Sequence, residues 1–592
     1  MDPKREFPAR LADRSRALWP ALGLLLVLAT ALRLHNTGLR SMSHPELFVP
    51  GLTLPAGLSV PAPRLDLFTT VKSTLSSDTH PPGYYVMMWF VTKAFGQSTW
   101  AIRLPSVLFG VASVGLLFWL GALVEQRTAG LIAAALLACN GYHVFWSRVA
   151  RMYSLECFLG LLGSILLLLL ARSGRRRRAL ETLYALLMLF GLTVHIFLWL
   201  VLATHMLWVF ANSWTRGQPR PRLLDWQLLV AVLGSPLVAF AAYQSGNPVA
   251  TLSTEVARYG REFVGFAFLF PSPRSDTSPA DPSVGAWLLP DLSALWPLLL
   301  AISLALLWLG LRSLTYAPEP LPTAPGGGFG KAWLAATALA IAAILAHILM
   351  AERYAAPAPL PTLKYTKALL ALPPLMALAA LGLARKWNRL PLWLRAATDH
   401  RFFTGGQGLA VMMVAVPFLL LCALSLLFRP MLYERGLLFA APYLFLLLGE
   451  GIARVATIRW LGVLLALLLV MFHGYSAAAY AWRNVDPLDH RVFAAKLTPR
   501  VSPGDLLFLR ADWNTAPILY YLPVSRYRLV GGEYEAACAR NPDARVWTLM
   551  FYDQKQRKEQ EMAEALADYR SIASVEVKHA RAVLHIRKAT AQ

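Results

Sequence analysis

The chain has 592 residues, of which 57% are hydrophobic and only 15% are charged. Soluble domains usually carry about 25% charged residues, so this composition excludes an ordinary soluble protein and indicates a polytopic membrane protein. The formal net charge of +23 does not indicate nucleic-acid binding, because the basic residues form short clusters between apolar runs. We attribute most of this charge to the cytoplasmic loops of a membrane protein, since positively charged loops stay in the cytoplasm.

Local motifs exclude several other classes of protein. The four cysteines form no CxxC pair, so neither a disulfide framework nor a cysteine metal site is expected. The chain also has no Walker-type phosphate loop, no Rossmann fingerprint and no HExxH zinc helix. Cytosolic nucleotide chemistry therefore has no support in the sequence.

The N-terminal region predicts one retained membrane span and a long outer loop. A basic stretch at 1–16 precedes an apolar run at 17–34, which places the N-terminus in the cytoplasm. The polar residues 37–82 then lie outside, and ordered loops of this length are more often functional than short ones. Residues 84–95 are too few to span, so we expect a helix lying at the membrane surface.

The remaining apolar runs predict further spans that alternate in direction and keep each main basic cluster inside. The run at 180–210 is too long for one span and splits near His195. With this split we expect about 13 transmembrane helices, within a membrane domain at 1–481 that has a second outer loop at 245–290. The expected spans are 17–34, 102–123, 128–144, 154–171, 180–210 as two helices, 223–243, 292–311, 332–350, one that ends at 385–386, 409–428, 437–452 and 461–480.

The tail, residues 482–592, changes character. Short apolar runs at 505–509, 546–550 and 582–586 are typical of strands, and a charged stretch at 554–569 is typical of a helix. The topology leaves this segment outside the membrane, so we expect a small soluble α/β domain there.

Three carboxylates of the first loop could act as a general base: Glu46, Asp66 and Asp78. A solvated loop carboxylate without a catalytic role is the commoner case. His80-Pro81-Pro82 forms a rigid corner, because each proline fixes its own φ and restricts the residue before it. The alternative is that these prolines only end the loop.

Cations at the outer ends of spans are candidates for binding an anion. Arg148 and Arg151 lie three residues apart, so on a helix they would share a face, and the planar fork of arginine suits phosphate. Interfacial arginines also extend toward lipid headgroups, which is the alternative. Other cations lie in a similar setting, immediately before an inward span and close to a tyrosine. They are Lys364, which is followed by Tyr365, and Arg435. We expect His195 to be a buried histidine with its hydrogen bonds satisfied.

Several of these motifs resemble those of one family. They are 80–85, 96 and 101–106, 147–153, Arg435 before the span that contains Pro442, and 503–505 with Tyr520 and Tyr521 in the tail. Through them the chain resembles the GT-C class of membrane glycosyltransferases, and within it the bacterial relatives of the protein O-mannosyltransferases and of the lipid A aminoarabinose transferase.

The resemblance implies an inverting transfer of a sugar from a polyprenyl-phosphate donor to a lipid, glycan or protein acceptor, at the outer face of the bacterial inner membrane. Glu46 matches the glutamate of the family's Asp-Glu pair, but Pro45 replaces the aspartate, so Asp66 and Asp78 stay alternatives as base. The resemblance implies that basic residues bind the donor phosphate, and Arg151, Lys364 and Arg435 match the positions of these residues in the family. Some relatives bind a divalent metal and others do not, which leaves His44 and His80 as candidate ligands.

The expected site residues follow from the sequence motifs and from the family resemblance together. The expected donor-phosphate residues are Arg148, Arg151, Lys364, Tyr365 and Arg435, and the residues expected to shape the loop or the acceptor site are His80, Tyr84, Tyr85 and Arg258. Two alternatives share much of this pattern. One is a transporter or flippase for a lipid-linked sugar, although no internal repeat is visible. The other is a noncatalytic membrane scaffold that displays the tail.

Overall fold

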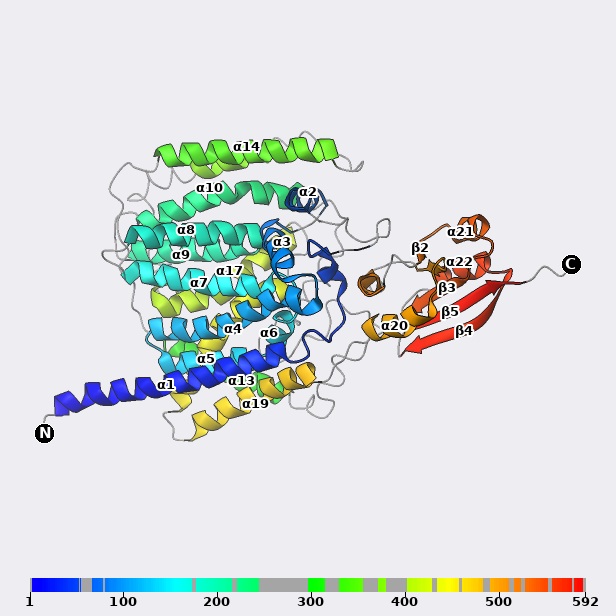
Figure 1. Ribbon diagram of the computed structural model, residues 1–592. Helices are drawn as coiled ribbons and strands as arrows, with labels where there is room; N and C mark the ends of the chain where they lie inside the picture. Colours follow the sequence, from blue (N-terminus) through cyan, green and yellow to red (C-terminus); the bar gives the residue numbers. More distant parts are fainter. Residues whose placement is uncertain are drawn as a thin grey trace.

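A computed structural model provides the structure of the chain. It describes residues 3–52, 54, 66–77, 80–172, 177–215, 221–243, 296–314, 330–354, 371–378, 402–427, 434–456, 460–482, 490–509, 516–522, 527–551, 556–577 and 580–588. A helical bundle makes up most of the molecule, and a small domain with a sheet lies beyond one end of it (Figure 1). The N-terminus lies at the opposite end of the bundle, far from this domain (Figure 1).

The bundle consists of mostly apolar helices of different lengths. Its helices are α1 (Pro3–Leu34), α4 (Thr99–Leu123), α5 (Arg127–Cys139), α7 (Tyr153–Arg172), α8 (Arg177–Val194), α9 (Leu198–Thr215), α10 (Arg222–Tyr243), α13 (Trp296–Arg312), α14 (Gly330–Tyr354), α17 (Gly405–Leu427), α18 (Ala441–Val455) and α19 (Leu461–Trp482). Within the described part of the chain, four stretches are long and apolar enough to cross a membrane: α4, α7, 405–425 and 435–455. The total of about 13 spans stays a prediction.

Helix α18 lies at the centre of the bundle and packs against α5, α13 and α17. Glycines allow the closest approaches. A Cβ atom on Gly451 would lie 1.9 Å from the backbone oxygen of Leu306 in α13, and one on Gly449 would lie 2.5 Å from that of Ala129 in α5. Small residues at such crossings let two backbones meet, which is a common basis of helix association in membranes.

Two expectations about single helices had different outcomes. The split of 180–210 is confirmed, because α8 ends at Val194 and α9 begins at Leu198. The run expected as one span at 128–144 is not one continuous helix, because the chain breaks at Asn140 into α5 and a short helix α6 (Gly141–Trp146). The Asn140 side chain accepts a hydrogen bond from the backbone N–H of His143 at 2.8 Å, which caps the new helix.

The short elements η1 (His44–Phe48), α2 (Leu67–Ser77) and α3 (Gly83–Phe95) lie at the end of the bundle nearer to the sheet domain (Figure 1). Helix α3 confirms the expected helix at 84–95. Its last residue precedes Gly96, whose φ of +83° lies in the left-handed region that favours glycine.

The tail forms a five-stranded sheet with the order β2-β1-β3-β5-β4. Strand β1 (Leu506–Phe508) pairs in parallel with β2 (Arg528–Val530) and β3 (Val546–Phe551), whereas β5 (Ala580–Arg587) runs antiparallel to β3 and β4 (Tyr569–Val577). Helices α20 (His490–Leu497), η5 (Thr498–Arg500), η6 (Ala516–Tyr520), α21 (Tyr534–Arg540) and α22 (Gln556–Ala565) complete the domain.

The three expected strands of the tail are therefore present, and β2 and β4 are additional. The helix expected at 554–569 is too long at its C-terminal end, because α22 ends at Ala565 and Tyr569 begins β4. Asp505 precedes β1 and is nearly fully buried. It accepts hydrogen bonds from Arg545, at 2.7 and 2.8 Å, and from the Trp547 indole at 3.0 Å, which ties β1 to β3.

Candidate active site

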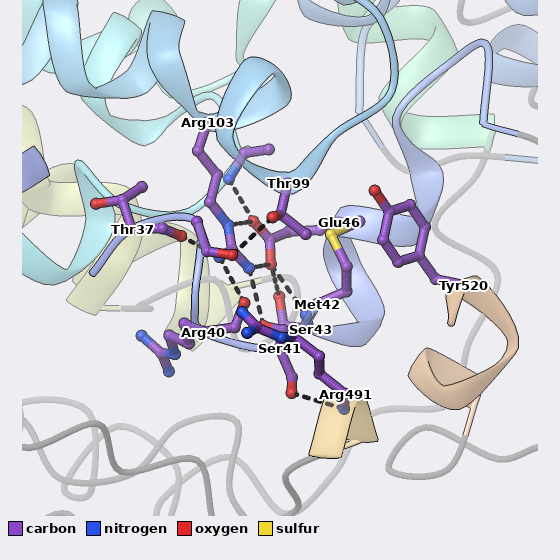
Figure 2. A network of polar contacts seen from close by, with 12 residues as sticks. Thr37, Arg40, Ser41, Met42, Ser43, Glu46, Thr99, Arg103, Arg491 and Tyr520 are labelled. Atoms are coloured by element: carbon purple, nitrogen blue, oxygen red, sulfur yellow. Dashed lines mark hydrogen bonds and ion pairs between the residues drawn. The ribbon is translucent and has the colours of Figure 1, made fainter. Parts of the chain in front are cut away.

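The first loop is wrapped around one buried arginine, Arg103 of α4 (Figure 2). Its Nε and Nη2 donate to the two oxygens of Glu46, each at 2.7 Å. Its Nη1 donates to the backbone oxygens of Thr37 and Arg40, and Nη2 also donates to that of Ser41. A guanidinium has five N–H donors, and all five are used here. Arg103 therefore fixes the course of the loop from residue 37 to residue 46.

Glu46 is equally engaged. Besides Arg103, its oxygens accept hydrogen bonds from the backbone N–H of Ala150 and from both the backbone N–H and the hydroxyl of Ser43, at 2.9 to 3.0 Å. Burial raises the pKa of this carboxyl, but the charge and hydrogen bonds of Arg103 and the backbone donors outweigh it and hold the pKa below its usual value. A carboxylate offers about four lone-pair sites, so this one has little capacity left for an acceptor hydroxyl.

The other two loop carboxylates differ in setting. Asp66 precedes α2, and its side chain accepts hydrogen bonds from the hydroxyl and the backbone N–H of Thr69, which caps the helix. These bonds lower the pKa of Asp66, which is exposed to solvent. Asp78 lies outside the described residues, two positions before His80 in the sequence.

Arg151 joins the segment 147–151 to the first loop. It lies between α6 and α7 and is 7% exposed. Its Nη1 donates to the Tyr85 hydroxyl at 3.1 Å and to the backbone oxygen of Pro45 at 3.3 Å, and its Nη2 lies 3.4 Å from Nε2 of His80. The structure thus brings together Arg151, His80 and Tyr85 beside the residue that precedes Glu46.

Arg148 lies in the same segment and is 3% exposed. It donates to the Thr37 hydroxyl at 3.2 Å and to the backbone oxygen of His35. Burial, and then the charges of Arg40, Arg103 and Arg33, lower the pKa of Arg148. Several guanidinium groups therefore converge at this end of the bundle, and such a concentration of buried positive charge favours a bound anion.

Glu156 and His195 form a buried carboxylate–imidazole pair next to His80. Nδ1 of His195 is 3.1 Å from a carboxylate oxygen of Glu156, which lies in the first turn of α7. The His195 ring is stacked on His80, with the centroids 5.8 Å apart, and it also contacts Tyr153. His195 is buried as expected, but its hydrogen bonds are not satisfied as expected, because Nδ1 makes no hydrogen bond within the described residues. It faces Glu156 instead, a carboxylate that was not predicted as a site residue. The signal was present, since Glu156 is a lone carboxylate in an apolar run.

The remaining predicted residues fall into two groups. Tyr84 and Tyr85 are both buried, and their rings meet edge to face. Arg435 begins the stretch that leads into α18. The next residue, Gly436, packs directly against Phe197. The Phe197 ring in turn contacts the His195 ring. Four predicted site residues, Asp78, Arg258, Lys364 and Tyr365, lie outside the described residues.

The described residues do not fit a metal site. No three side chains of His, Cys, Asp or Glu gather in this part of the chain so that they could hold a metal ion. His44 lies beside Phe48, and His80 lies between His195 and Arg151, so these two candidate ligands are in different surroundings.

Comparisons with known proteins give one family and several solved structures. Residues 79–239 match the model of a family described as dolichyl-phosphate-mannose-protein mannosyltransferase. ArnT from Cupriavidus metallidurans in the apo state is 12% identical, with a TM-score of 0.40, and the match covers 97% of this chain and 98% of that chain. ArnT bound to undecaprenyl phosphate is 14% identical, with a TM-score of 0.38 and coverage of 96% and 98%.

An oligosaccharyltransferase from Archaeoglobus fulgidus in complex with Zn and sulfate is 12% identical to the chain. Its TM-score is 0.43, and the match covers 95% of this chain and 72% of that chain. No curated protein matches the chain.

Proposed function

We propose that this chain, which resembles the GT-C class of membrane glycosyltransferases, transfers a sugar from a polyprenyl-phosphate donor to an acceptor hydroxyl at the outer face of the membrane. The observation that carries the proposal is the convergence of buried arginines on the segment 147–151 and the first loop. A guanidinium donates two parallel hydrogen bonds to a phosphate, and in a buried site the interaction is stronger than in water.

The proposed reaction inverts the anomeric carbon. The acceptor oxygen forms a bond to this carbon from the face opposite the phosphate, and the bond from the carbon to the phosphate oxygen breaks. The bonding electron pair leaves with the lipid phosphate, and the acceptor's proton passes to a base. Arg148 and Arg151, with Lys364, Tyr365 and Arg435, stabilise the charge that develops on the leaving phosphate.

The three loop carboxylates have different roles in this proposal. Glu46 anchors the loop through Arg103, because its oxygens are saturated with hydrogen bonds and its pKa is lowered. Asp66 caps α2. Asp78 is the base, since it is two residues from His80, which lies against Arg151. His80, Tyr84, Tyr85 and Arg258 shape the acceptor side of the site.

The same proposal includes the location of the chain. About 13 spans in the bacterial inner membrane would place the N-terminus in the cytoplasm and the domain at 482–592 outside, in the periplasm. This orientation keeps the arginine run at 175–178 in the cytoplasm and puts the first loop, 147–151 and the tail on one face.

Two measurements test the proposal. Native mass spectrometry of the purified protein should detect bound polyprenyl phosphate, and Arg151→Ala should reduce its occupancy about tenfold or more, since a charged hydrogen bond is worth roughly 1.5–3 kcal/mol. Arg312→Ala, at the end of α13, is the matched control and should retain the lipid. Asp78→Asn should abolish sugar transfer in membranes supplied with donor while lipid occupancy persists.

The outcomes separate the alternatives. Full transfer activity in both Arg151→Ala and Asp78→Asn would overturn the assignment of these residues. Bound lipid with no transfer to any acceptor, together with movement of the lipid-linked sugar across vesicles, would identify a flippase instead. A protein that retains no polyprenyl phosphate at all would point to a scaffold.

A further inference from the structure

We propose that the C-terminal domain positions the first loop, with Tyr521 and Arg491 as the positioning residues. These residues hold segment 39–42 from the side of the tail, while Arg103 holds the same segment from the bundle. The functional part of the inference rests on the proposed function, because it takes the first loop as one wall of the transfer site.

The loop is hydrogen-bonded to the tail at three points, two on its backbone and one on the Ser41 hydroxyl. The Tyr521 hydroxyl accepts a hydrogen bond from the backbone N–H of Met42 at 2.8 Å. The backbone N–H of Arg491 donates to the Ser41 hydroxyl, and its Nη1 donates to the backbone oxygen of Leu39, each at 3.3 Å. Arg491 and Tyr520 flank the loop on this side in Figure 2.

The same stretch is bonded to the bundle at matching points. Arg103 donates to the backbone oxygens of Arg40 and Ser41, at 2.9 and 2.8 Å. Ser41 thus receives a hydrogen bond from each domain, one at its backbone oxygen and one at its hydroxyl. Only five residues farther along the chain, Glu46 closes the network on Arg103. A shift of the tail would therefore be transmitted to the loop at the point where Arg103 organises it.

Burial makes the bonds at Ser41 and Met42 hard to replace with water, whereas the contact between Arg491 and Leu39 is exposed. Ser41 is 3% exposed and Met42 is 2% exposed. A buried backbone N–H without a partner loses the hydrogen bond that it made to water in the unfolded chain, so Met42 depends on the Tyr521 hydroxyl.

Apolar contacts fix the orientation of the tail relative to the first loop. The 3-10 turn η1 of the loop packs against η6 of the tail. The tail residues Ile518, Leu519 and Leu522 belong to one continuous apolar core with Leu47 of the loop. The Tyr520 hydroxyl also donates to the backbone oxygen of Gln97, between α3 and α4. The tail therefore reaches both the loop and the start of the helix that carries Arg103.

This arrangement predicts a specific kinetic effect. Tyr521 and Arg491 act through the loop backbone and not on the lipid phosphate, which the proposed function assigns to Arg148 and Arg151. Loosening the tail contact should lower the turnover number of sugar transfer, because the acceptor side loses its geometry. It should leave the occupancy of polyprenyl phosphate unchanged.

The test compares matched pairs of variants in the full-length protein. Tyr521→Phe removes only the hydroxyl that Met42 uses, and Tyr569→Phe makes the same change in strand β4 of the tail, away from the loop. Arg491→Ala removes the side-chain contact to Leu39, and Arg500→Ala removes an exposed arginine that donates to Ser574 within the tail. The readouts are amide hydrogen exchange of residues 39–46, turnover and lipid occupancy.

We expect residues 39–46 to exchange roughly tenfold faster in Tyr521→Phe than in its control, with turnover several-fold lower and lipid occupancy unchanged. Arg491→Ala should change exchange and turnover in the same direction but by less, because its bond to Leu39 is exposed. Unchanged exchange in Tyr521→Phe and Arg491→Ala would overturn the inference whatever the activity. Faster exchange with unchanged turnover would overturn the positioning role. If the wild-type protein transfers no sugar and holds no lipid, the proposed function fails, and the exchange data alone decide whether the tail holds the loop.

Discussion

Glu46 and Arg103 lie 57 residues apart in the sequence, and their side chains meet in a bidentate pair with both N···O distances at 2.7 Å. Both side chains are only 1% exposed. Such charge-assisted pairs are among the strongest hydrogen bonds in proteins, and their energy depends on both partners being present. The pair therefore decides whether the first loop keeps its conformation.

Replacing Glu46 alone should be strongly destabilising. Glu46→Ala leaves the charge of Arg103 buried without its carboxylate partner, which typically costs about 3–5 kcal/mol. We expect a clearly lower unfolding temperature in detergent and loss of transfer activity. The double variant Glu46→Gln with Arg103→Gln should lose less stability than the single variants Glu46→Gln and Arg103→Gln added together, because it leaves no buried charge without its partner. Additive losses would show that the two side chains do not interact.

The same pair predicts how stability depends on pH. The pKa of Glu46 in the folded protein lies below the ordinary value of 4.5. Its contribution to stability is therefore fully present above the ordinary pKa and is lost as the pH falls through the folded-state pKa. The difference in unfolding temperature between wild type and Glu46→Gln should stay constant between about pH 8 and pH 6 and shrink in strong acid. A difference that changes between these two pH values would contradict the lowered pKa.

The sequence predicted the elements better than it predicted their contacts. Hydrophobic length was enough to place most helices and to split the run at His195, because span length is set by the thickness of the bilayer. The break at Asn140 was missed, although asparagine is a common N-cap, since the apolar run continues through it. The pairing of Arg103 with Glu46 was also missed, because nothing in a local pattern links residues that far apart.

The buried pair of His195 and Glu156 gives a prediction about stability. His195→Phe keeps an aromatic ring stacked near His80 but removes the nitrogen that faces Glu156. We expect this variant to be less stable, because a fully buried carboxylate loses its nearest polar partner. Glu156→Gln, which removes the charge, should restore stability when it is combined with His195→Phe. Thermal unfolding of the two single variants and the double variant measures this coupling, and a double variant less stable than His195→Phe would refute it.

The crossing of α13 and α18 gives a prediction that does not depend on the site. A Cβ atom on Gly451 would lie 1.9 Å from the backbone oxygen of Leu306, so Gly451→Ala forces the two helices apart. Such overpacking typically costs about 1–3 kcal/mol, and we expect a lower unfolding temperature. Gly23→Ala in α1 is the control, because no atom lies within 4 Å of its Cβ position. Alanine is favoured over glycine inside a helix by roughly 0.5–1 kcal/mol, so the control should be as stable as wild type or more stable. If Gly451→Ala were as stable as Gly23→Ala, the close contact between α13 and α18 would be wrong.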